Sequence, residues 1–311
     1  MRAMPFPGAV PFASSDGLTL ACQALRAFGV MAGSLALAVA QPVSEPVREM
    51  IEVGDHKLQM VRGGAGRVTV IFETGAGGHL DLWLPIAARL NAEAATICYS
   101  RAGARGSEDA SYVRTPAAVA TELHTMLSRA GVPPPYVLVG ASIGGLYVRA
   151  FATKYPSEVA GLVLVDPSHE RQMIVGREKM TADELAKELV AAAKRPPLTR
   201  REIDGVKAVW DSGQLDVAGS LPDVPMTILT SIRRIVAAKG ISEEQRKAEI
   251  GAWRGLHGEL FAQVSNGQHI VTDRADHNME RVEPGPELVV GAVRWVLAAA
   301  NATATKGSPK P

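Results

Sequence analysis

Short apolar runs alternate with longer segments of helical period along most of the chain. The runs are rich in β-branched residues and suit strands that are buried on both faces. They fall at Val68–Phe72, Ala95–Tyr99, Tyr136–Val139, Gly161–Val165, Met226–Thr230 and Gln268–Thr272. Between them, apolar residues recur at helical spacing, as in the helix expected over Pro116–Ala130. The alternation predicts an α/β fold with a mostly parallel central sheet flanked by helices.

The pattern at the two ends of this region sets its boundaries. Met50–Val53 and Lys57–Arg62 alternate as the two strands of a hairpin, ahead of the first buried run. Pro286–Ala299 has a helical period and is expected to be the last helix. We therefore expect one domain over residues 49–299, followed by a disordered tail at 300–311.

The turn after the Tyr136–Val139 strand carries a G-x-S-x-G pentapeptide, Gly140–Gly144, with Ser142 at its centre. Leu146–Phe151 then continues at helical spacing. In such a strand–turn–helix, glycines two residues before and after the serine allow a sharp turn that lifts the hydroxyl above the sheet edge. That geometry suits a nucleophile, and we expect Ser142 to be one. The alternative is a glycine-rich turn with a passive serine.

At three expected helix starts, a Ser or Thr is followed three positions later by Glu or Gln, the capping-box pattern. They are Thr181, Thr199 and Ser242. The first two fall between Pro167 and Pro222, where the strand–helix alternation pauses. We therefore predict a small helical cap inserted at about residues 167–222, after the strand that follows the Ser142 helix.

Composition narrows the possible functions. The chain has 311 residues, 47% of them hydrophobic and 21% charged, with a formal net charge of +1. No basic footprint of nucleic-acid binding is visible in the sequence. Metal-ligand spacing and a P-loop are absent, and Gly75–Gly78 lacks the third glycine of a dinucleotide site, so no metal or cofactor is expected. Cys22 and Cys98 imply no disulfide framework, and Cys98 is expected to be a buried free thiol.

The N-terminal region has the pattern of a secretory signal. An apolar run at 27–40 follows Arg26, ends in Ala38-Val39-Ala40 and precedes a proline-interrupted linker at 41–48. The run is short for a bilayer span and matches the hydrophobic region and A-x-A site of a signal peptide. We expect cleavage after Ala40 and export to the periplasm or medium, or an N-terminal anchor if the segment is retained. The alternative is an apolar helix on a cytoplasmic protein.

Taken together, the motifs resemble those of the α/β-hydrolase superfamily over about residues 49–299. They are the pentapeptide Gly140–Gly144, the glycine loop Gly75–Gly78, the S-R-A-G-A-R-G-S loop Ser100–Ser107 and a late histidine. The resemblance implies a serine hydrolase with a triad in the chain order Ser, Asp, His.

The sequence departs from the superfamily pattern at three places. Thr74 stands where a histidine often precedes the oxyanion glycine, Ser100 replaces a frequent aspartate, and Ala275-Asp276 replaces the usual small residues before the histidine. These differences leave the catalytic atoms in place. They do not favour any particular subfamily.

A serine hydroxyl needs a base within hydrogen-bond reach, and the chain has seven histidines. His277 is the best placed, in the loop between the last strand and the last helix. His269 and His257 fall within a strand and a helix, where structural roles prevail. His79, beside the glycine loop, and His169, at the start of the cap, are expected to line the pocket and bind substrate. The alternative for both is a solvated loop position.

The acid that orients the histidine can follow either of two strands in this fold. After Met226–Thr230 no carboxylate occurs until Glu243. Asp166 ends the strand after the Ser142 helix, and we expect it to be the triad acid. An aspartate before proline can also be a structural turn residue, in which case Asp273, Asp276 and Glu243 are the alternatives.

Acyl transfer also needs two preorganised N–H donors for the oxyanion. The residue after the nucleophile, Ile143, is expected to supply one. The second should come from the glycine loop, and the alignment of its glycines points to Ala76.

The resulting prediction is a capped carboxylic-ester hydrolase that acts on a small-molecule ester through an acyl-enzyme. Apolar cap residues such as Met173 and Trp210 suit an acyl or aromatic group. The alternatives are a lactone or C–C hydrolase, an aminopeptidase-type enzyme if Glu170, Asp183 or Glu184 faces the pocket, and a non-catalytic binding protein. Dehalogenase and epoxide-hydrolase chemistry is disfavoured, because those members of the superfamily carry an aspartate where Ser142 stands.

Overall fold

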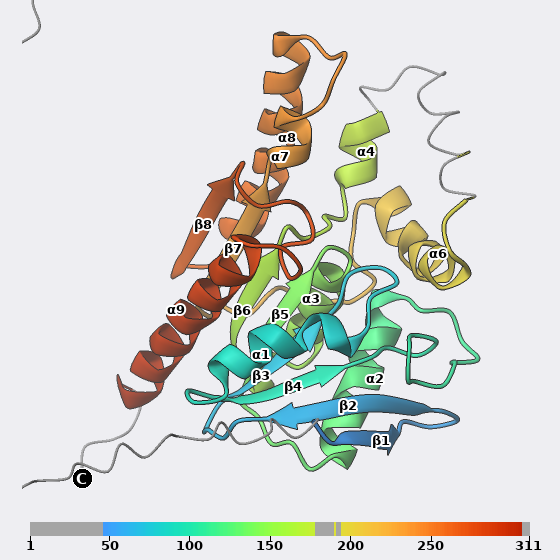
Figure 1. The fold of residues 1–311 in the computed structure, drawn as a ribbon, viewed down its shortest axis with the longest axis vertical. Helices are drawn as coiled ribbons and strands as arrows, with labels where there is room; N and C mark the ends of the chain where they lie inside the picture. The colour runs from blue at the N-terminus through green and yellow to red at the C-terminus, as the bar shows by residue number, and fades with distance from the viewer. Residues whose placement is uncertain (1–45, 178–189, 191–193, 307–311) are drawn as a thin grey trace, which may run out of the picture. The chain divides into compact units, whose positions relative to one another are not determined.

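The sheet predicted from the apolar runs forms the centre of the protein (Figure 1). The computed structural model describes residues 46–177, 190 and 194–306. The N-terminal segment 1–40 and the expected helix start at Thr181 lie outside these ranges. In the described part, the eight strands of the sheet are β1 (Arg48–Glu52), β2 (Lys57–Gly63), β3 (Thr69–Glu73), β4 (Ala95–Tyr99), β5 (Tyr136–Ala141), β6 (Val159–Val165), β7 (Met226–Ser231) and β8 (Gly267–Thr272).

The strand order is β1-β2-β4-β3-β5-β6-β7-β8, and only the pairings made by β2 are antiparallel. The mostly parallel sheet is therefore confirmed. Its register aligns the carboxyl ends of the central strands, since Glu73 pairs with Gly140, Ala141 with Val165, and Ser231 with Thr272. The loops that leave these strands consequently meet at one edge of the sheet, where ligands bind in open α/β folds.

Helices cover both faces of the sheet. They are α1 (Leu84–Leu90), α2 (Pro116–Arg129), α3 (Gly144–Lys154), α4 (Gln172–Arg177), α6 (Pro197–Ser212), α7 (Arg233–Val236), α8 (Glu243–Phe261) and α9 (Gly285–Lys306), with short 3₁₀ turns η1 (Leu80–Leu82) and η2 (Pro156–Glu158). Packing places α1 and α9 on one face and α2, α3 and α8 on the other (Figure 1).

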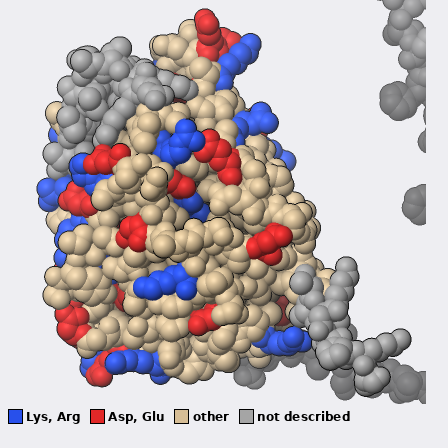
Figure 2. Space-filling view, turned by 180° about the vertical axis from the view of Figure 1, so that it is seen from behind, with Lys and Arg blue, Asp and Glu red and all other residues tan. Residues whose placement is uncertain are grey.

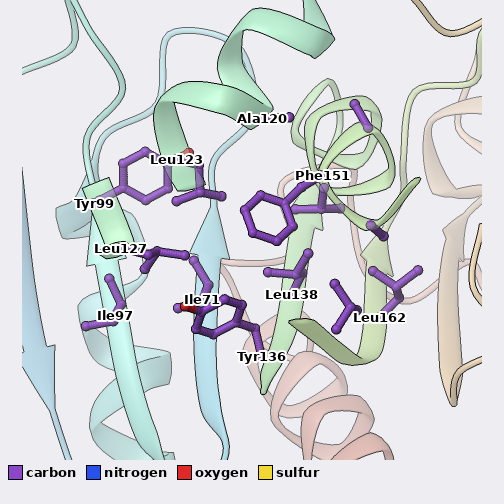
Figure 3. Packing of buried hydrophobic residues seen from close by; sticks show 14 of the residues in the cluster. Ile71, Ile97, Tyr99, Ala120, Leu123, Leu127, Tyr136, Leu138, Phe151 and Leu162 are labelled. Carbon is purple, nitrogen blue, oxygen red and sulfur yellow. The ribbon is translucent and has the colours of Figure 1, made fainter. Parts of the chain in front are cut away.

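Alternate residues of each central strand feed two separate cores. In β5, Leu138 packs with Leu123 of α2 and Phe151 of α3, as Figure 3 shows. Its neighbours Val137 and Val139 join the core beneath α1 and α9. This is why the strands read as continuous apolar runs: both faces of the sheet are buried.

Within residues 167–222, where a cap was expected, the described structure has the helices α4 and α6, which lie beyond the carboxyl ends of β5 and β6 (Figure 1). The apolar face of α6, including Val206 and Trp210, packs on Ile143 and Tyr147 at the start of α3. α6 therefore covers the turn that carries Ser142.

The capping-box prediction was right for one of the two helices that can be compared. Ser242 and Gln245 form both hydrogen bonds of a capping box at the start of α8. The prediction at Thr199 was wrong, because α6 begins at Pro197, with Pro196 as N-cap and no side-chain cap bond. Proline favours the first helical positions and sets this earlier start, and Glu202 is buried instead of capping.

Two further predictions can be compared with the structure: the C-terminal tail and the state of Cys98. The helix α9 continues to Lys306, so the expected disordered tail was wrong for 300–306. Cys98 is a buried free thiol, as predicted, and burial raises its pKa.

Lys and Arg side chains are interspersed with Asp and Glu on the face seen in Figure 2. Among the described residues, no helix combines the length and apolarity needed to cross a membrane.

Candidate active site

Ser142 lies at the tight turn between β5 and α3, with the backbone in the left-handed region at φ 52°. Glycines make this turn possible. A Cβ on Gly140 would lie 2.6 Å from the carbonyl oxygen of Gly144, and one on Gly144 would lie 2.6 Å from that of Thr74. The turn therefore holds a non-glycine residue in a strained conformation, as at functional sites.

Ser142, His277 and Asp166 are connected by two hydrogen bonds. Nε2 of His277 lies 3.0 Å from Oγ of Ser142, and its Nδ1 lies 2.6 Å from Oδ2 of Asp166. The Asp166 side chain is only 4% exposed and that of His277 26% exposed. The structure thus brings together three residues that are far apart in the chain and that sequence reasoning had chosen.

The His277 loop is held in place by the end of β7. Ser231 Oγ donates to the carbonyl of Ala275 at 2.7 Å, and Arg233 Nη1 donates to that of Arg274 at 2.7 Å. Ala275 and Met279 on either side of the histidine are buried in the core beneath α9. These contacts fix the backbone from which His277 projects.

The other carboxylate oxygen of Asp166 accepts two hydrogen bonds. Oδ1 accepts from the backbone N–H of Ser231 at 2.9 Å and from Nε1 of Trp253 at 3.0 Å. Sequence reasoning missed Trp253, which belongs to α8 and lies 87 positions from Asp166. No local pattern could have linked the two residues.

The alternative acids lie elsewhere. Oδ1 of Asp276 accepts from the backbone N–H of His277 at 2.7 Å, so this carboxylate caps the loop rather than meeting the imidazole. Glu243 sits in the first turn of α8 and is paired with Arg246. Asp166 is the carboxylate that contacts the His277 ring.

The two backbone amides expected to bind an oxyanion are placed beside Ser142. Ala76 and Ile143 both line the cleft that contains Ser142 and His277. Gly75 is so close that a Cβ on it would lie 3.3 Å from Cβ of Ser142. Within the described part of the chain, neither the Ala76 nor the Ile143 N–H is bonded to a backbone carbonyl. Both donors are therefore available to a ligand.

A buried charged cluster lies behind this glycine loop and was not anticipated. It joins Glu73, Arg101 and Glu202, three side chains that are at most 1% exposed. Burial raises the pKa of the Glu73 carboxyl, although Arg101 and the Tyr99 hydroxyl act in the opposite direction. The S-R-A-G-A-R-G-S loop was a signal for Arg101, but nothing in the sequence pointed to its partners.

The cleft over Ser142 has a volume of about 750 Å³ and a mixed lining. Its apolar part includes Ala76, Ile143, Met173, Ile203, Trp210 and Trp253. Its charged part includes, besides Asp166, the side chains of Asp204, Asp211, Glu249, Arg195, Lys207 and Arg234. An apolar wall with charges of both signs suits an uncharged or weakly polar organic ligand.

The structure does not place His79 or His169 in this lining, although both were expected to contact substrate. Nδ1 of His79 turns to Asp81 at 3.0 Å. His169 is buried, and its Nδ1 accepts from the backbone N–H of Arg171 at 3.0 Å. Burial lowers the pKa of His169 to about 4. Sequence position put both residues near the site but could not give the direction of their side chains.

Behind Asp166, a chain of buried polar groups links α8 to β7 and β8. His257 Nε2 lies 2.9 Å from the carbonyl oxygen of Pro167, and its Nδ1 lies 2.6 Å from Oγ1 of Thr230. The same hydroxyl lies 2.8 Å from Nε2 of His269. Burial lowers the pKa of His257 to about 4. Both histidines are structural here, as the sequence predicted.

The carboxylates considered for holding an amine are only partly described. Glu170 is bound by Nη2 of Arg149 at 2.7 Å and is not part of the cleft lining. Asp183 and Glu184 lie outside the described residues. Among those that are described, no group of His, Cys, Asp and Glu is arranged to hold a metal ion.

Comparison with known proteins points to the α/β-hydrolase fold. A family model of the α/β-hydrolase fold matches residues 68–217. The uncharacterized protein YqjL of Bacillus subtilis (strain 168) is 26% identical over 240 residues, which cover 72% of this chain and 81% of YqjL.

Two solved structures show how far the fold is shared. Lip1 of Acinetobacter baumannii AYE, a lipase by name, superposes with a TM-score of 0.62 at 18% identity, over 83% of this chain and 93% of Lip1. The epoxide hydrolase CorEH superposes with a TM-score of 0.57 at 13% identity, over 82% of this chain and 99% of CorEH. At these identities the likeness concerns the fold alone.

Proposed function

We propose that this chain, which has the α/β-hydrolase fold, is a serine hydrolase of carboxylic esters. The proposal is carried by one observation. Asp166, His277 and Ser142 form an unbroken line of hydrogen bonds that ends in the cleft, beside the N–H groups of Ala76 and Ile143. A nucleophile, a base, an orienting acid and an oxyanion site are the groups that acyl transfer requires.

In the proposed first half-reaction, His277 Nε2 takes the proton of Ser142 as Oγ attacks the ester carbonyl. Asp166 holds Nδ1–H of the imidazole, which fixes the tautomer and stabilises the imidazolium that forms. The Ala76 and Ile143 N–H groups donate hydrogen bonds to the developing oxyanion. His277 then gives its proton to the leaving alcohol, and an acyl-enzyme remains on Ser142.

In the second half-reaction, a water molecule takes the place of the alcohol. His277 removes a proton from the water, which attacks the acyl carbon through a second oxyanion held by the same two amides. Collapse returns the proton to Ser142 and releases the acid.

The epoxide-hydrolase neighbour does not redirect this proposal. A serine at the turn after β5 argues against the alkyl-enzyme chemistry of that group, which begins from an aspartate at this position. The carboxylates Asp204 and Glu249 line the cleft and favour a second candidate, hydrolysis of substrates that carry an amine, such as amino-acid amides.

A substrate panel tests the proposal and separates the two candidates. We expect 4-nitrophenyl esters of rising acyl length to be turned over, with a preference for chains that fill the apolar part of the cleft. Amino-acid 4-nitroanilides and lactones are assayed beside them. Preferred turnover of the anilides would favour the second candidate, and an absence of turnover across the panel would favour a binding protein.

A further inference from the structure

The Arg101 side chain is wholly buried behind the glycine loop and is bonded to its backbone. Nη1 donates to the carbonyl of Thr74 at 2.7 Å and to its hydroxyl at 2.8 Å, while Nη2 donates to the carbonyl of Gly75 at 2.8 Å. Nη1 also bonds to Glu73. One guanidinium therefore holds two successive carbonyl groups of the loop that precedes Ala76.

These bonds determine where the Ala76 N–H points. In a planar trans peptide the C=O and N–H groups point in opposite directions. Because Arg101 holds the Gly75 carbonyl on the buried side of the loop, the N–H of the same peptide unit, that of Ala76, faces the other side. That side is the cleft, which Ala76 lines together with Ser142. A flip of this peptide would require breaking the bond to Arg101.

Glu202 extends the same restraint to the next peptide. Its Oε1 accepts from Arg101 Nε at 2.8 Å and Nη2 at 2.6 Å, and its Oε2 accepts from the backbone N–H of Gly77 at 2.6 Å. Both oxygens are thus acceptors, which glutamine could not reproduce.

Glu202 belongs to the cap helix α6, which sits directly on the glycine loop. A Cβ on Gly77 would lie 2.5 Å from Oγ1 of Thr199, in the first turn of α6. The bonds from Glu202 therefore connect the cap to the loop that carries the oxyanion donor.

We propose that Arg101 and Glu202 are positioning residues that hold the Gly75–Ala76 peptide with its N–H toward Ser142, so that the seating of α6 completes the oxyanion site. This inference rests on the proposed serine hydrolase function, because an oxyanion forms only in acyl transfer. Neither side chain lines the cleft, so both act through the loop backbone.

The variants Glu202→Gln and Arg101→Lys test the inference. Glutamine keeps the shape of Glu202 but supplies one acceptor where two are used, and lysine keeps the charge of Arg101 but loses its fork. Two controls are matched to them. Arg201→Ala removes an exposed ion pair between α6 and Asp109, which follows the Ser100–Ser107 loop. Glu122→Gln alters another buried carboxylate, which is bonded to Arg114.

The first measurement is the rate of covalent labelling by a fluorophosphonate probe, whose phosphoryl oxygen needs the oxyanion site. We expect labelling to slow about tenfold in Glu202→Gln and on the order of 10²-fold in Arg101→Lys, the loss typical of a removed oxyanion donor. Both controls should be labelled within about twofold of the wild-type rate.

The second measurement separates positioning from general damage. An alkyl trifluoromethyl ketone forms a tetrahedral oxyanion adduct with serine, and the corresponding secondary alcohol does not. We expect the inhibition constant of the ketone to rise in parallel with the loss of labelling rate, while that of the alcohol stays within about twofold. Inhibition constants do not depend on the fraction of folded enzyme, so partial unfolding cannot mimic this result.

The outcomes distinguish the inference from the function on which it rests. If the wild-type protein is not labelled at all, the serine hydrolase proposal fails and the inference fails with it. If the wild type is labelled and Glu202→Gln is labelled equally fast, the function stands and the inference is wrong. A parallel rise of both inhibition constants would also overturn the inference, because it would indicate a disturbed cleft.

Discussion

The Asp166 carboxylate accepts hydrogen bonds on both of its oxygens, and the two oxygens have different roles. Oδ2 faces His277, whereas Oδ1 is held by Ser231 and Trp253. The sequence could predict Asp166 because no carboxylate follows β7 for some distance. It could not predict Trp253, because the contact depends on how α8 packs across the sheet edge.

The first residue-scale prediction concerns the role of Asp166. Asp166→Asn preserves packing but favours the wrong imidazole tautomer of His277, so kcat should fall on the order of 10⁴-fold, as in the serine-protease example of the same change. Steady-state kinetics on the best ester measures this. Asp276→Asn is the matched control and should retain activity within about tenfold. An active Asp166→Asn and an inactive Asp276→Asn would reverse the assignment.

The second residue-scale prediction concerns the indole of Trp253. Trp253→Phe removes a donor to Oδ1 of Asp166 while keeping an aromatic ring, and a hydrogen bond to a charged group contributes roughly 1.5–3 kcal/mol. We expect kcat to fall about tenfold. Trp210→Phe is the control, because Trp210 also lines the cleft but its Nε1 has no hydrogen-bond partner in the described structure. Equal losses in the two variants would indicate substrate packing rather than support of Asp166.

At the scale of elements, hydrophobic period predicted the strands and main helices because both faces of this sheet are buried. Helix starts were less predictable, as α6 shows. Its sequence predicts a capping box at Thr199, but the helix begins earlier, at Pro197, with Pro196 as the N-cap. Glu202 is bonded to Arg101 instead of capping the helix. His79 and His169 do not line the cleft for a related reason, since a loop position does not fix the direction of a side chain.

The capping difference supports an element-scale prediction. Ser242→Ala removes the side-chain acceptor of the N-cap of α8, so the free energy of unfolding should fall by about 1 kcal/mol. Thr199→Ala removes a hydroxyl that makes no cap hydrogen bond, so the free energy of unfolding should fall clearly less than in Ser242→Ala. Urea unfolding of the two variants and the wild type measures this difference. A larger loss in Thr199→Ala than in Ser242→Ala would contradict the capping described for the two helices.

At the scale of the whole molecule, parallel strands bring the loops after β3, β5, β6 and β8 to one edge of the sheet, and that edge carries the site. The same arrangement buries His257 between α8, β7 and Pro167. Its pKa is lowered by burial from an ordinary value of 6.5 to about 4. Burial lowers the pKa of His169 to about 4 as well.

These shifts predict a loss of stability in acid. The unfolded chain binds a proton on His257 near pH 6.5, whereas the folded protein does so only near pH 4. The stabilisation is therefore fully present above pH 6.5 and is lost as the pH falls toward 4, by up to about 3 kcal/mol for this residue.

Urea unfolding between pH 7.5 and pH 4.5 measures that dependence. His257→Asn should be less stable than the wild type at neutral pH, because it loses buried hydrogen bonds, but it should lose less stability on acidification. Parallel curves for the two proteins would show that His257 does not contribute to the pH dependence.

The central claim is that Ser142 is the nucleophile, and mass mapping of a fluorophosphonate adduct tests it most directly. Ser168 also lines the cleft, but in the described structure His277 Nε2 is bonded to the hydroxyl of Ser142, so Ser168 provides the matched control. We expect a single adduct on Ser142 in the wild type and in Ser168→Ala. Ser142→Ala should give no adduct, with ester turnover lowered on the order of 10⁵–10⁶-fold. An adduct on another residue, or retained labelling and turnover in Ser142→Ala, would contradict the account.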